Sequence, residues 1–325
     1  MTSRIDHGGR LAAARADHPL APEPWLDLST GINPEGWRQR GVPVSVLARL
    51  PDPADLAALE AVAANAFGTD PDRVVAVGGA EAGLRLLPVI ISARRVVIAS
   101  PIYGSHADAW ALAGATVIET PREKLFGEDA DVRIIVNPNN PDGAATPGAE
   151  LVAQSGDRWL IVDESFVEVE PELSAAALRA ERTIVLRSFG KFHGLPGVRL
   201  GFVVAPLDIA RQLRARIGDW PVGADAIAMG RAAYRDAAWA DRIRKRLAAD
   251  AARLDGLLAS YGLEIVGGTS LFRLARCEDA KARAWRLGEQ GVLVRTFSHD
   301  ADLIRFGVPG RSNWRRLVQA LERSR

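Results

Sequence analysis

The sequence predicts an α/β protein, with a large domain built on a mostly parallel central sheet flanked by helices and a smaller α+β domain after it. Two observations carry this prediction. Short β-branched runs alternate with helical patterns through the middle of the 325-residue chain, as expected of a layered α/β domain. The runs are apolar throughout, which is typical of strands that are buried on both faces.

The elements of the large domain, predicted to span residues 31–207, follow one another in a regular order. An alanine-rich helix is expected at 54–66, and further helices at 80–91 and 105–112 separate strands. The predicted strands are 73–77, 95–99, 116–119, 133–136, 159–162, 183–186 and 198–204.

The pattern changes after about residue 207, where the predicted small domain (208–325) begins. A long, arginine-rich helix is expected at 237–260. Short strands are predicted near 263–266, 271–274, 292–294 and 303–306. The N-terminal segment 1–30 is expected to contribute to the same small domain.

Composition argues against several classes of protein. Hydrophobic residues make up 48% of the chain and charged residues 25%, which fits a folded core rather than disorder. The net charge of +1 gives no electrostatic reason to expect nucleic acid or a membrane surface as a partner. Cys277, the single cysteine, offers no disulfide and no metal-binding spacing. Without a signal-peptide pattern or an apolar run near ~20 residues, a cytoplasmic protein is expected.

Polar or glycine-rich residues follow five of the predicted strands. Ligands of open α/β sheets bind beyond the carboxyl ends of the strands, so these segments are expected to meet at one site. They are 78–81 (Gly-Gly-Ala-Glu), 100–103 (Ser-Pro-Ile-Tyr), 137–141 (Asn-Pro-Asn-Asn-Pro), 163–164 (Asp-Glu) and 188–191 (Ser-Phe-Gly-Lys).

Three of these segments each have a chemical and a plain structural interpretation. The glycines at 78–79 open a helix and offer backbone N–H groups to an anion, or they form an ordinary turn. Tyr103 is suited to stacking on a planar ring, or to packing as a half-buried aromatic. Asn140 is able to donate to a ligand oxygen, although Asn-Asn-Pro is also common turn chemistry.

Asp163 and Lys191 point to more specific chemistry. Asp163 follows four apolar residues, and a partly desolvated carboxylate there favours a cationic partner such as a pyridinium N–H. A helix cap or an ion pair with an arginine is the alternative. Lys191 lies among glycines and apolar residues, where a lysine becomes a nucleophile for a carbonyl carbon. A solvent-exposed loop lysine is the alternative there.

The order of these motifs resembles that of the fold-type-I pyridoxal-phosphate (PLP) enzymes. Within them the chain is similar to the histidinol-phosphate aminotransferases, and more so to the L-threonine-O-3-phosphate decarboxylase branch of cobalamin biosynthesis. The segments that favour this branch are His7-Gly8-Gly9, Leu26-Asp27-Leu28-Ser29-Thr30-Gly31-Ile32-Asn33-Pro34 and Ser188-Phe189-Gly190-Lys191-Phe192-His193-Gly194-Leu195-Pro196-Gly197-Val198-Arg199.

The resemblance implies PLP as the cofactor and a fold-type-I PLP-dependent transferase fold. Lys191 would hold PLP as a Schiff base and move protons at the reacting carbon, while Asp163 would keep the ring nitrogen protonated. Tyr103 would stack on the ring and Asn140 would bind its phenolic oxygen. The implied phosphate contacts are the backbone groups of Gly79, Ala80 and Glu81, together with Ser188 and Arg199.

The resemblance also implies a small phosphorylated amino acid as substrate. Arg305 would grip the substrate carboxylate, and Arg295 would contact a second anion such as the substrate phosphate. Surface ion pairs are the alternative for both arginines. A cover over the substrate phosphate is implied for His7, Gly8, Gly9 and Asn33, whereas a disordered leader is the alternative for residues 7–9.

The implied reaction is decarboxylation of L-threonine O-3-phosphate to (R)-1-amino-2-propanol O-2-phosphate and CO2 by a homodimer. An aminotransferase, such as one acting on histidinol phosphate, is the alternative. A regulator that uses a PLP fold without catalysis belongs to another class, and its DNA-binding domain is not expected in so short an N-terminal segment.

Two positions depart from the pattern of the family. Phe166 stands where relatives commonly have tyrosine, so the phenolic oxygen of PLP should lack one hydrogen bond. The less stabilised phenolate should hold the neighbouring imine proton more tightly, and this proton should remain bound at neutral pH. Leu50 precedes Pro51-Asp52 where relatives often have a tyrosine that reaches the cofactor of the partner subunit.

Overall fold

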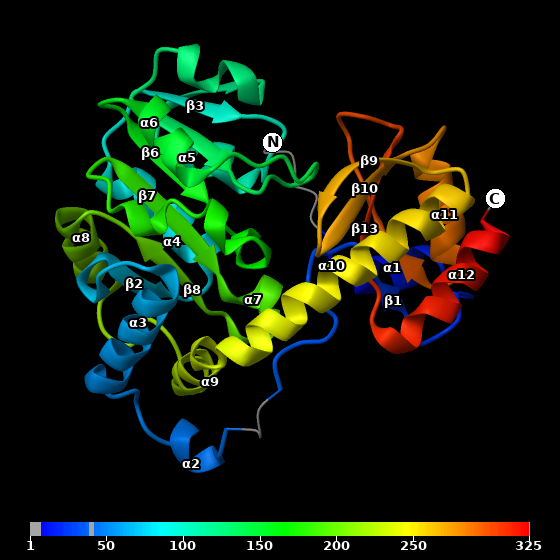
Figure 1. The fold of residues 1–325 in the computed structure, drawn as a ribbon, viewed down its shortest axis with the longest axis horizontal. Helices are drawn as coiled ribbons and strands as arrows, with labels where there is room; N and C mark the ends of the chain where they lie inside the picture. The colour runs from blue at the N-terminus through cyan, green and yellow to red at the C-terminus, as the bar shows by residue number, and fades with distance from the viewer. Residues whose placement is uncertain (1–7, 39–41, 325) are drawn as a thin grey trace. The chain divides into compact units, whose positions relative to one another are not determined.

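The computed structural model describes residues 8–38 and 42–324, which divide into a large and a small unit (Figure 1). The large unit holds residues 36–140 and 144–239, and the small unit holds the chain up to Glu35, residues 141–143 and residues from 240 onward. The expected boundaries at 30 and 207 therefore differ from those in the structure. Residues 208–239 fold with the large unit because α8 (Leu207–Ile217) and α9 (Ala224–Arg235) contribute to its two apolar cores.

The sheet of the large unit has the strand order β2-β8-β7-β6-β5-β3-β4. Neighbouring strands are parallel except that β8 runs antiparallel to both β2 and β7. This confirms the predicted α/β class with a mostly parallel sheet. The strands are β2 (Val74–Val77), β3 (Arg95–Ala99), β4 (Thr116–Thr120), β5 (Val132–Val136), β6 (Trp159–Asp163), β7 (Thr183–Ser188) and β8 (Gly201–Val204).

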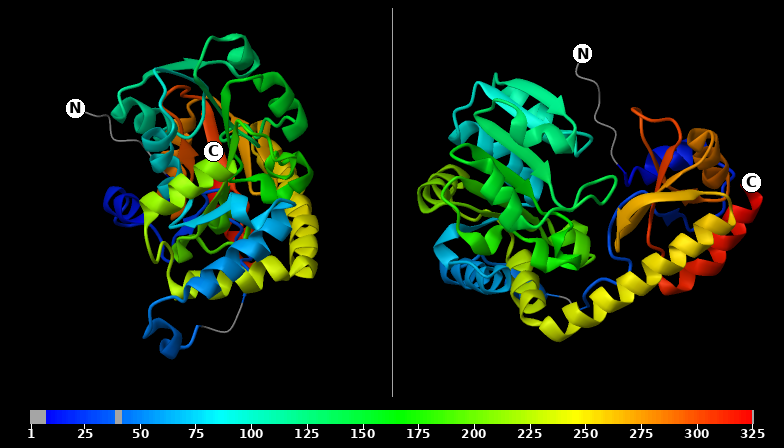
Figure 2. Two further views of the ribbon diagram at one scale, coloured as in Figure 1. Left: turned by 90° about the vertical axis from the view of Figure 1, so that its left-hand side faces the viewer. Right: turned by 45° about the horizontal axis from the view of Figure 1, so that its top comes forward.

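Helices cover both faces of this sheet, as the views in Figure 2 show. One face packs against α3 (Pro53–Phe67), α6 (Gly148–Ser155) and α9, and the other packs against α4 (Ala80–Ile90), α5 (Ser105–Leu112) and α8. Successive strand residues point to opposite faces, so Ile161 joins one apolar core and Val162 the other. The continuous apolar runs in the sequence are explained by this double burial. Two short helices, α2 (Val44–Leu47) and α7 (Phe189–Phe192), complete the α-helices described for this unit.

The predicted strand at 198–204 is wrong over its first three residues. Residues Pro196–Val198 form a 3-10 turn, and Arg199 has left-handed backbone angles (φ 56°, ψ 51°). A left-handed residue cannot continue a β-strand, so β8 begins only at Gly201. The helix predicted at 54–66 corresponds to α3.

The small unit contains the antiparallel sheet β12-β13-β10-β9 and the parallel pair β1-β11. Its apolar core joins the sheet to the three helices α10, α11 and α12. The elements are α1 (Leu11–Asp17), β1 (Leu26–Asp27), α10 (Ala237–Ser260), β9 (Glu264–Thr269), β10 (Phe272–Arg276), α11 (Ala280–Glu289), β11 (Val292–Leu293), β12 (Arg295–Thr296), β13 (Leu303–Gly307) and α12 (Trp314–Arg323). Across residues 8–38 and 42–324, every helix is too short or too polar to span a bilayer.

Candidate active site

The five polar segments of the large unit lie at one edge of its sheet, because β2, β3, β5, β6 and β7 all point the same way. The antiparallel strand β8 begins at that edge, where Gly201 pairs with Val77 on one side and with Ser188 on the other. Arg199 is therefore carried to the same edge by a strand of opposite direction. Nothing in the sequence pattern predicts that direction.

Arg199 lies beside the N-terminus of α4. Gly79 precedes the helix with φ +93°, and a Cβ at this position would lie 2.5 Å from Nη2 of Arg199. A Cβ on Gly201 would likewise collide with the backbone nitrogen of Ala80. Both positions therefore favour glycine, and the guanidinium of Arg199 lies beside the residue that precedes α4. The Glu81 carboxylate binds Arg85 at 2.7 Å, so the backbone N–H of Glu81 is its suitable group for an anion.

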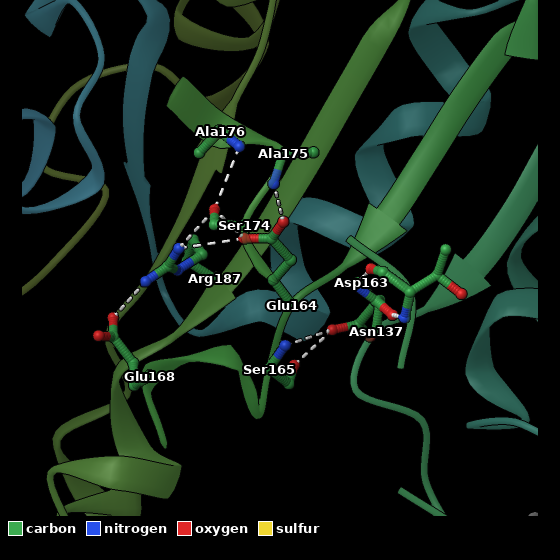
Figure 3. A network of polar contacts seen from close by, with 10 residues as sticks. Asn137, Asp163, Glu164, Ser165, Glu168, Ser174, Ala175, Ala176 and Arg187 are labelled. Atoms are coloured by element: carbon green, nitrogen blue, oxygen red, sulfur yellow. Dashed lines mark hydrogen bonds and ion pairs between the residues drawn. The ribbon is translucent and has the colours of Figure 1, made fainter. Parts of the chain in front are cut away.

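Asp163 is the buried anion of this edge, with 4% of its surface exposed. Its Oδ1 accepts hydrogen bonds from the backbone N–H (3.0 Å) and the hydroxyl (2.6 Å) of Ser165, as Figure 3 shows. Its Oδ2 lies 2.9 Å from Nε2 of His106. Burial by itself raises the pKa of the Asp163 carboxyl, but the hydrogen bonds and charge from His106 and the bonds from Ser165 outweigh it, so the net pKa is lowered.

His106 is a site residue that the sequence analysis missed. It lies in the first turn of α5 and is 1% exposed. Its ring centroid is 6.4 Å from that of Tyr103, edge to face, and burial raises the pKa of the Tyr103 hydroxyl. A usable signal was present, because a histidine three residues after Tyr103 in a helix that follows a strand end belongs to the same edge.

Lys191 lies on α7, which follows directly after β7. Its Nζ is 5.7 Å from the ring centroid of Phe166, three residues beyond Asp163. The structure thus places Lys191 beside the loop that carries the buried aspartate. His193 holds the following turn by stacking between Phe189 (ring centroids 4.4 Å apart) and Trp239 (5.6 Å).

Asn140 follows two asparagines, Asn137 and Asn139, whose side chains form hydrogen bonds within the protein. The side-chain oxygen of Asn137 accepts from Nη2 of Arg122 (2.8 Å) and from the backbone N–H of Thr146 (2.9 Å). The amide of Asn139 donates to the backbone carbonyl of Pro101 (3.1 Å), in the segment that leads to Tyr103. The Asn140 loop and the Tyr103 loop are therefore tied together at this edge.

In the small unit, two arginines lie directly opposite each other on adjacent strands, Arg295 on β12 and Arg305 on β13. Arg305 is 6% exposed, donates to the backbone carbonyl of Ser29 (2.7 Å), and has its guanidinium 4.9 Å from the ring centroid of Phe272. Burial and the charge of Arg295, offset in part by Asp27, lower the pKa of Arg305 to about 9. A surface ion pair, the alternative interpretation, does not describe so buried a group.

The N-terminal glycines lie around the same serine. The Gly9 N–H donates to Oγ of Ser29 (2.7 Å), and a Cβ on Gly8 would collide with the carbonyl oxygen of Ser29 that accepts from Arg305. Gly8, Gly9, Ser29 and Arg295 line a cavity of about 340 Å³. Residues 8 and 9 are thus part of a built structure and not of a disordered leader.

The remaining predicted positions are distributed differently. Asn33 is 2% exposed, and its side-chain oxygen accepts from the backbone N–H of Glu35 (2.9 Å), which is turn chemistry. His7 lies outside the described residues. Leu50, at one of the two departures from the family pattern, follows α2 and is 68% exposed.

Comparison with known proteins identifies the family and the fold of the chain. Residues 25–321 match the family described as aminotransferase class I and II. The chain is similar to the threonine-phosphate decarboxylase of Pseudomonas aeruginosa, with 39% identity over 98% of this chain and 97% of the relative. It is also similar to that of a Sinorhizobium species, with 37% identity over 99% of both chains. Its fold matches the crystal structure of histidinol-phosphate aminotransferase from Sinorhizobium meliloti in complex with pyridoxal-5'-phosphate, with a TM-score of 0.84, 19% identity, and coverage of 100% of this chain and 99% of the other. The chain belongs to the class I and II aminotransferase family.

Proposed function

We propose that this protein uses PLP to decarboxylate L-threonine O-3-phosphate, releasing CO2 and (R)-1-amino-2-propanol O-2-phosphate for cobalamin biosynthesis. The observation that carries the proposal is the pair of relatives named threonine-phosphate decarboxylase, which are 39% and 37% identical over nearly the whole chain. The geometry supports it, because the buried Arg305 and the half-buried Arg295 lie opposite each other and suit a substrate with two anionic groups.

The residues of the large unit fit PLP. The first turn of α4 and Arg199 form a cradle in which only glycine is tolerated at position 79, as expected where a phosphate approaches the backbone. Ser188, at the end of β7, would add a hydroxyl donor. The buried carboxylate of Asp163, with its lowered pKa, would hold a proton on the ring nitrogen.

Other residues of the same edge would fix the ring and its carbonyl carbon. Asn140 would donate to the phenolic oxygen, Tyr103 would stack on the ring, and Lys191 would bind the carbonyl carbon as a Schiff base. When bound, PLP supplies an electron sink for the pair that a broken bond at Cα leaves behind.

The chain's own tasks in the reaction are orientation and proton transfer. Arg305 would bind the substrate carboxylate, Arg295 the phosphate, and the backbone of Gly8 and Gly9 would line the phosphate pocket. Breaking the bond from Cα to the carboxylate releases CO2. Lys191 would then deliver the proton that takes its place at Cα, while Asp163 keeps its negative charge throughout.

The test is to incubate purified protein and PLP with L-threonine O-3-phosphate without any keto acid, and to measure CO2 and the aminopropanol phosphate. Equal amounts of both products are expected. The Lys191→Ala variant is expected to lose both the turnover and the visible absorption of the bound cofactor. Turnover that appears only with histidinol phosphate and 2-oxoglutarate would overturn the proposal and make the protein an aminotransferase.

We also propose that the protein acts in the cytoplasm as a homodimer, which is what its resemblance to the family implies. Sedimentation velocity of the PLP-loaded protein is expected to give the mass of two chains of 34.9 kDa. A fully active species with the mass of one chain would contradict the dimer.

A further inference from the structure

A buried charge cluster lies on the face of the sheet opposite to Asp163, next to the proposed PLP site in the sequence (Figure 3). Arg187 donates from Nη1 to Oε2 of Glu164 (3.0 Å) and from Nη2 to Oε1 of Glu168 (2.6 Å). Arg187, Glu164 and Glu168 are only 2%, 1% and 7% exposed, respectively. Ser174 completes the cluster, because its hydroxyl donates to Oε2 of Glu164 (2.6 Å) and accepts from Nη1 of Arg187 (3.2 Å).

The cluster is connected to the site through the backbone. Glu164 directly follows Asp163, and Arg187 directly precedes Ser188. The register of β6 and β7 pairs Asp163 with Leu186, so Asp163 and Ser188 belong to one face of the sheet and Glu164 and Arg187 to the other. The guanidinium of Arg187 accordingly lies 4.2 Å from the ring centroid of Phe67, in the apolar core of the face opposite to Asp163.

The segment between β6 and β7 needs such an anchor. Residues 164–182 contain three 3-10 turns, Val167–Val169, Pro171–Leu173 and Ala176–Leu178, and no α-helix. All partners of Arg187 in the cluster come from this segment, and Glu164 also accepts from the backbone N–H of Ala175 (2.6 Å). One guanidinium therefore holds the segment at three places.

The same segment carries two residues that contact the site. Ser165 provides two hydrogen bonds to Asp163, and the ring of Phe166 lies next to Nζ of Lys191. Both lie between Glu164 and Glu168, the two carboxylates that Arg187 binds. A shift of this short stretch would move the donors of the buried aspartate and the apolar neighbour of the lysine together.

Stability alone is a poor reason for the cluster. Burying an ion pair costs desolvation free energy, and replacing such a pair by apolar side chains is often neutral or stabilising. The geometric consequence of the cluster is specific, because a guanidinium presents its donors in a rigid plane.

We propose that Arg187 is a positioning residue for the decarboxylation, acting through Glu164 and Glu168 to fix Asp163, Ser165 and Phe166 relative to Lys191. This inference rests on the proposed function. It makes the cluster part of the machinery that keeps the proton on the ring nitrogen, although Arg187 itself lies on the opposite face of the sheet from Asp163.

The test uses Arg187→Lys, which keeps the charge but loses the planar fork, and Glu168→Gln, which keeps the shape and the Glu164 bond. The matched control is Arg214→Lys. Arg214, on α8, also binds a carboxylate, Oε2 of Glu60 (3.0 Å), and donates to the carbonyl of Val74 (2.6 Å). Val74 is the first residue of β2, at the end of the strand remote from the site.

Both cluster variants are expected to lower kcat by roughly 10- to 100-fold, because misplacements near 1 Å cost about that much, while KM changes less than about 3-fold. They should also shift the pH midpoint of the visible absorption of the PLP-loaded protein without substrate. Arg214→Lys should change neither quantity, even where its melting temperature falls as far.

The positioning role would be overturned if the cluster variants behaved like the control. That outcome is equal kcat and equal spectral midpoints in Arg187→Lys, Glu168→Gln and Arg214→Lys, at matched losses of melting temperature. The spectral measurement requires bound PLP but no decarboxylation activity. A spectral shift confined to the cluster variants, in a protein that does not decarboxylate threonine phosphate, would support the positioning role and overturn the proposed reaction.

Discussion

Arg187 in the large unit and Arg305 in the small unit are buried to a similar degree but have opposite surroundings. Arg187 binds the carboxylates of Glu164 and Glu168. Arg305 lies directly across from Arg295. Burial by itself lowers the pKa of both guanidinium groups. For Arg187, the two glutamates outweigh burial and raise the pKa. For Arg305, the charge of Arg295 adds to the effect of burial, and the pKa falls to about 9.

The difference lies in how the charge of each arginine is balanced. Like charges directly opposite on neighbouring strands are destabilising, and Asp27 offsets only part of the excess around Arg305. The charge of Arg187 is balanced within the folded chain by Glu164 and Glu168, which agrees with the positioning role proposed for it. The charge of Arg305 is repelled by Arg295 and only partly offset by Asp27, which is consistent with the proposed role of Arg305 in binding an anionic substrate.

The largest expected effect comes from neutralising Asp163, the buried carboxylate proposed to face the ring nitrogen of PLP. Asp163→Asn should lower kcat on the order of 10³-fold, because a neutral amide no longer stabilises the proton on the ring nitrogen. KM should change much less, since Arg295 and Arg305, the arginines proposed to bind the substrate, are untouched. Steady-state kinetics of the PLP-loaded variant measures both, and a loss that appears mainly in KM would contradict the assigned role of Asp163.

Replacing each arginine by methionine tests the comparison directly. Arg187→Met should reduce the free energy of unfolding by about 3–5 kcal/mol, because it leaves two buried carboxylates without their cation. Arg305→Met should cost about 1 kcal/mol or less, since the lost bond to Ser29 is balanced by relief of the repulsion from Arg295. Urea unfolding of the apoproteins measures both values. Equal losses of unfolding free energy would contradict the difference between the two arginines.

An anion should stabilise the small unit through Arg305. Threonine phosphate at about 100 times its Kd should add about 2.7 kcal/mol to the free energy of unfolding, and Arg305→Met should remove most of this gain. The guanidinium is fully charged below its pKa of about 9, so the gain should be complete near pH 7 and shrink as the pH rises through 9.

The ligand-free protein should show the opposite trend with pH. The unfolded state keeps the arginine proton in a range where the folded state has lost it, so the wild type should gain stability relative to Arg305→Met as the pH rises through 9. Thermal melts at about pH 7 and about pH 10, with and without ligand, measure both trends. Parallel pH profiles of wild type and Arg305→Met would contradict the effect.

The smallest effect concerns Phe166. The wild type should hold the imine proton of Lys191 at neutral pH, and Phe166→Tyr should lower the pH midpoint of this titration by about one unit, the worth of one added hydrogen bond. The closeness of Phe166 to Nζ of Lys191 makes the substitution effective. Absorption recorded against pH is the measurement, and Phe192→Tyr, on α7, is the control. A midpoint below neutrality in the wild type would refute the prediction.

Much of the fold and part of the site were predictable because their signals are local. The strand 159–162 and the helix 237–260 follow from apolar runs and helical periodicity, and the structure has β6 and α10 at these places. Gly79, Asp163 and Lys191 follow strand ends in the sequence, and they lie at one edge because parallel strands share their direction. The specific site roles came from the resemblance of the motifs to a family.

Other features depend on residues that are far apart in the chain. His106 and Asp163 are 57 residues apart and meet only because α5 covers the face to which Asp163 points. Arg187 directly follows the predicted strand 183–186, and the sequence alone indicates no role for it. Its link to Glu168, 19 residues away, depends on the register of β7 against β6.

The sequence by itself thus determined the α/β class, the alternation of elements and the residue types at the strand ends, because hydrophobic periodicity and turn chemistry act over a few residues. Only the tertiary structure decided the antiparallel direction of β8, the unit boundary within α10, and the opposite surroundings of Arg187 and Arg305. Those features are set by strand order and register, which are chosen by packing between segments that are distant in the chain.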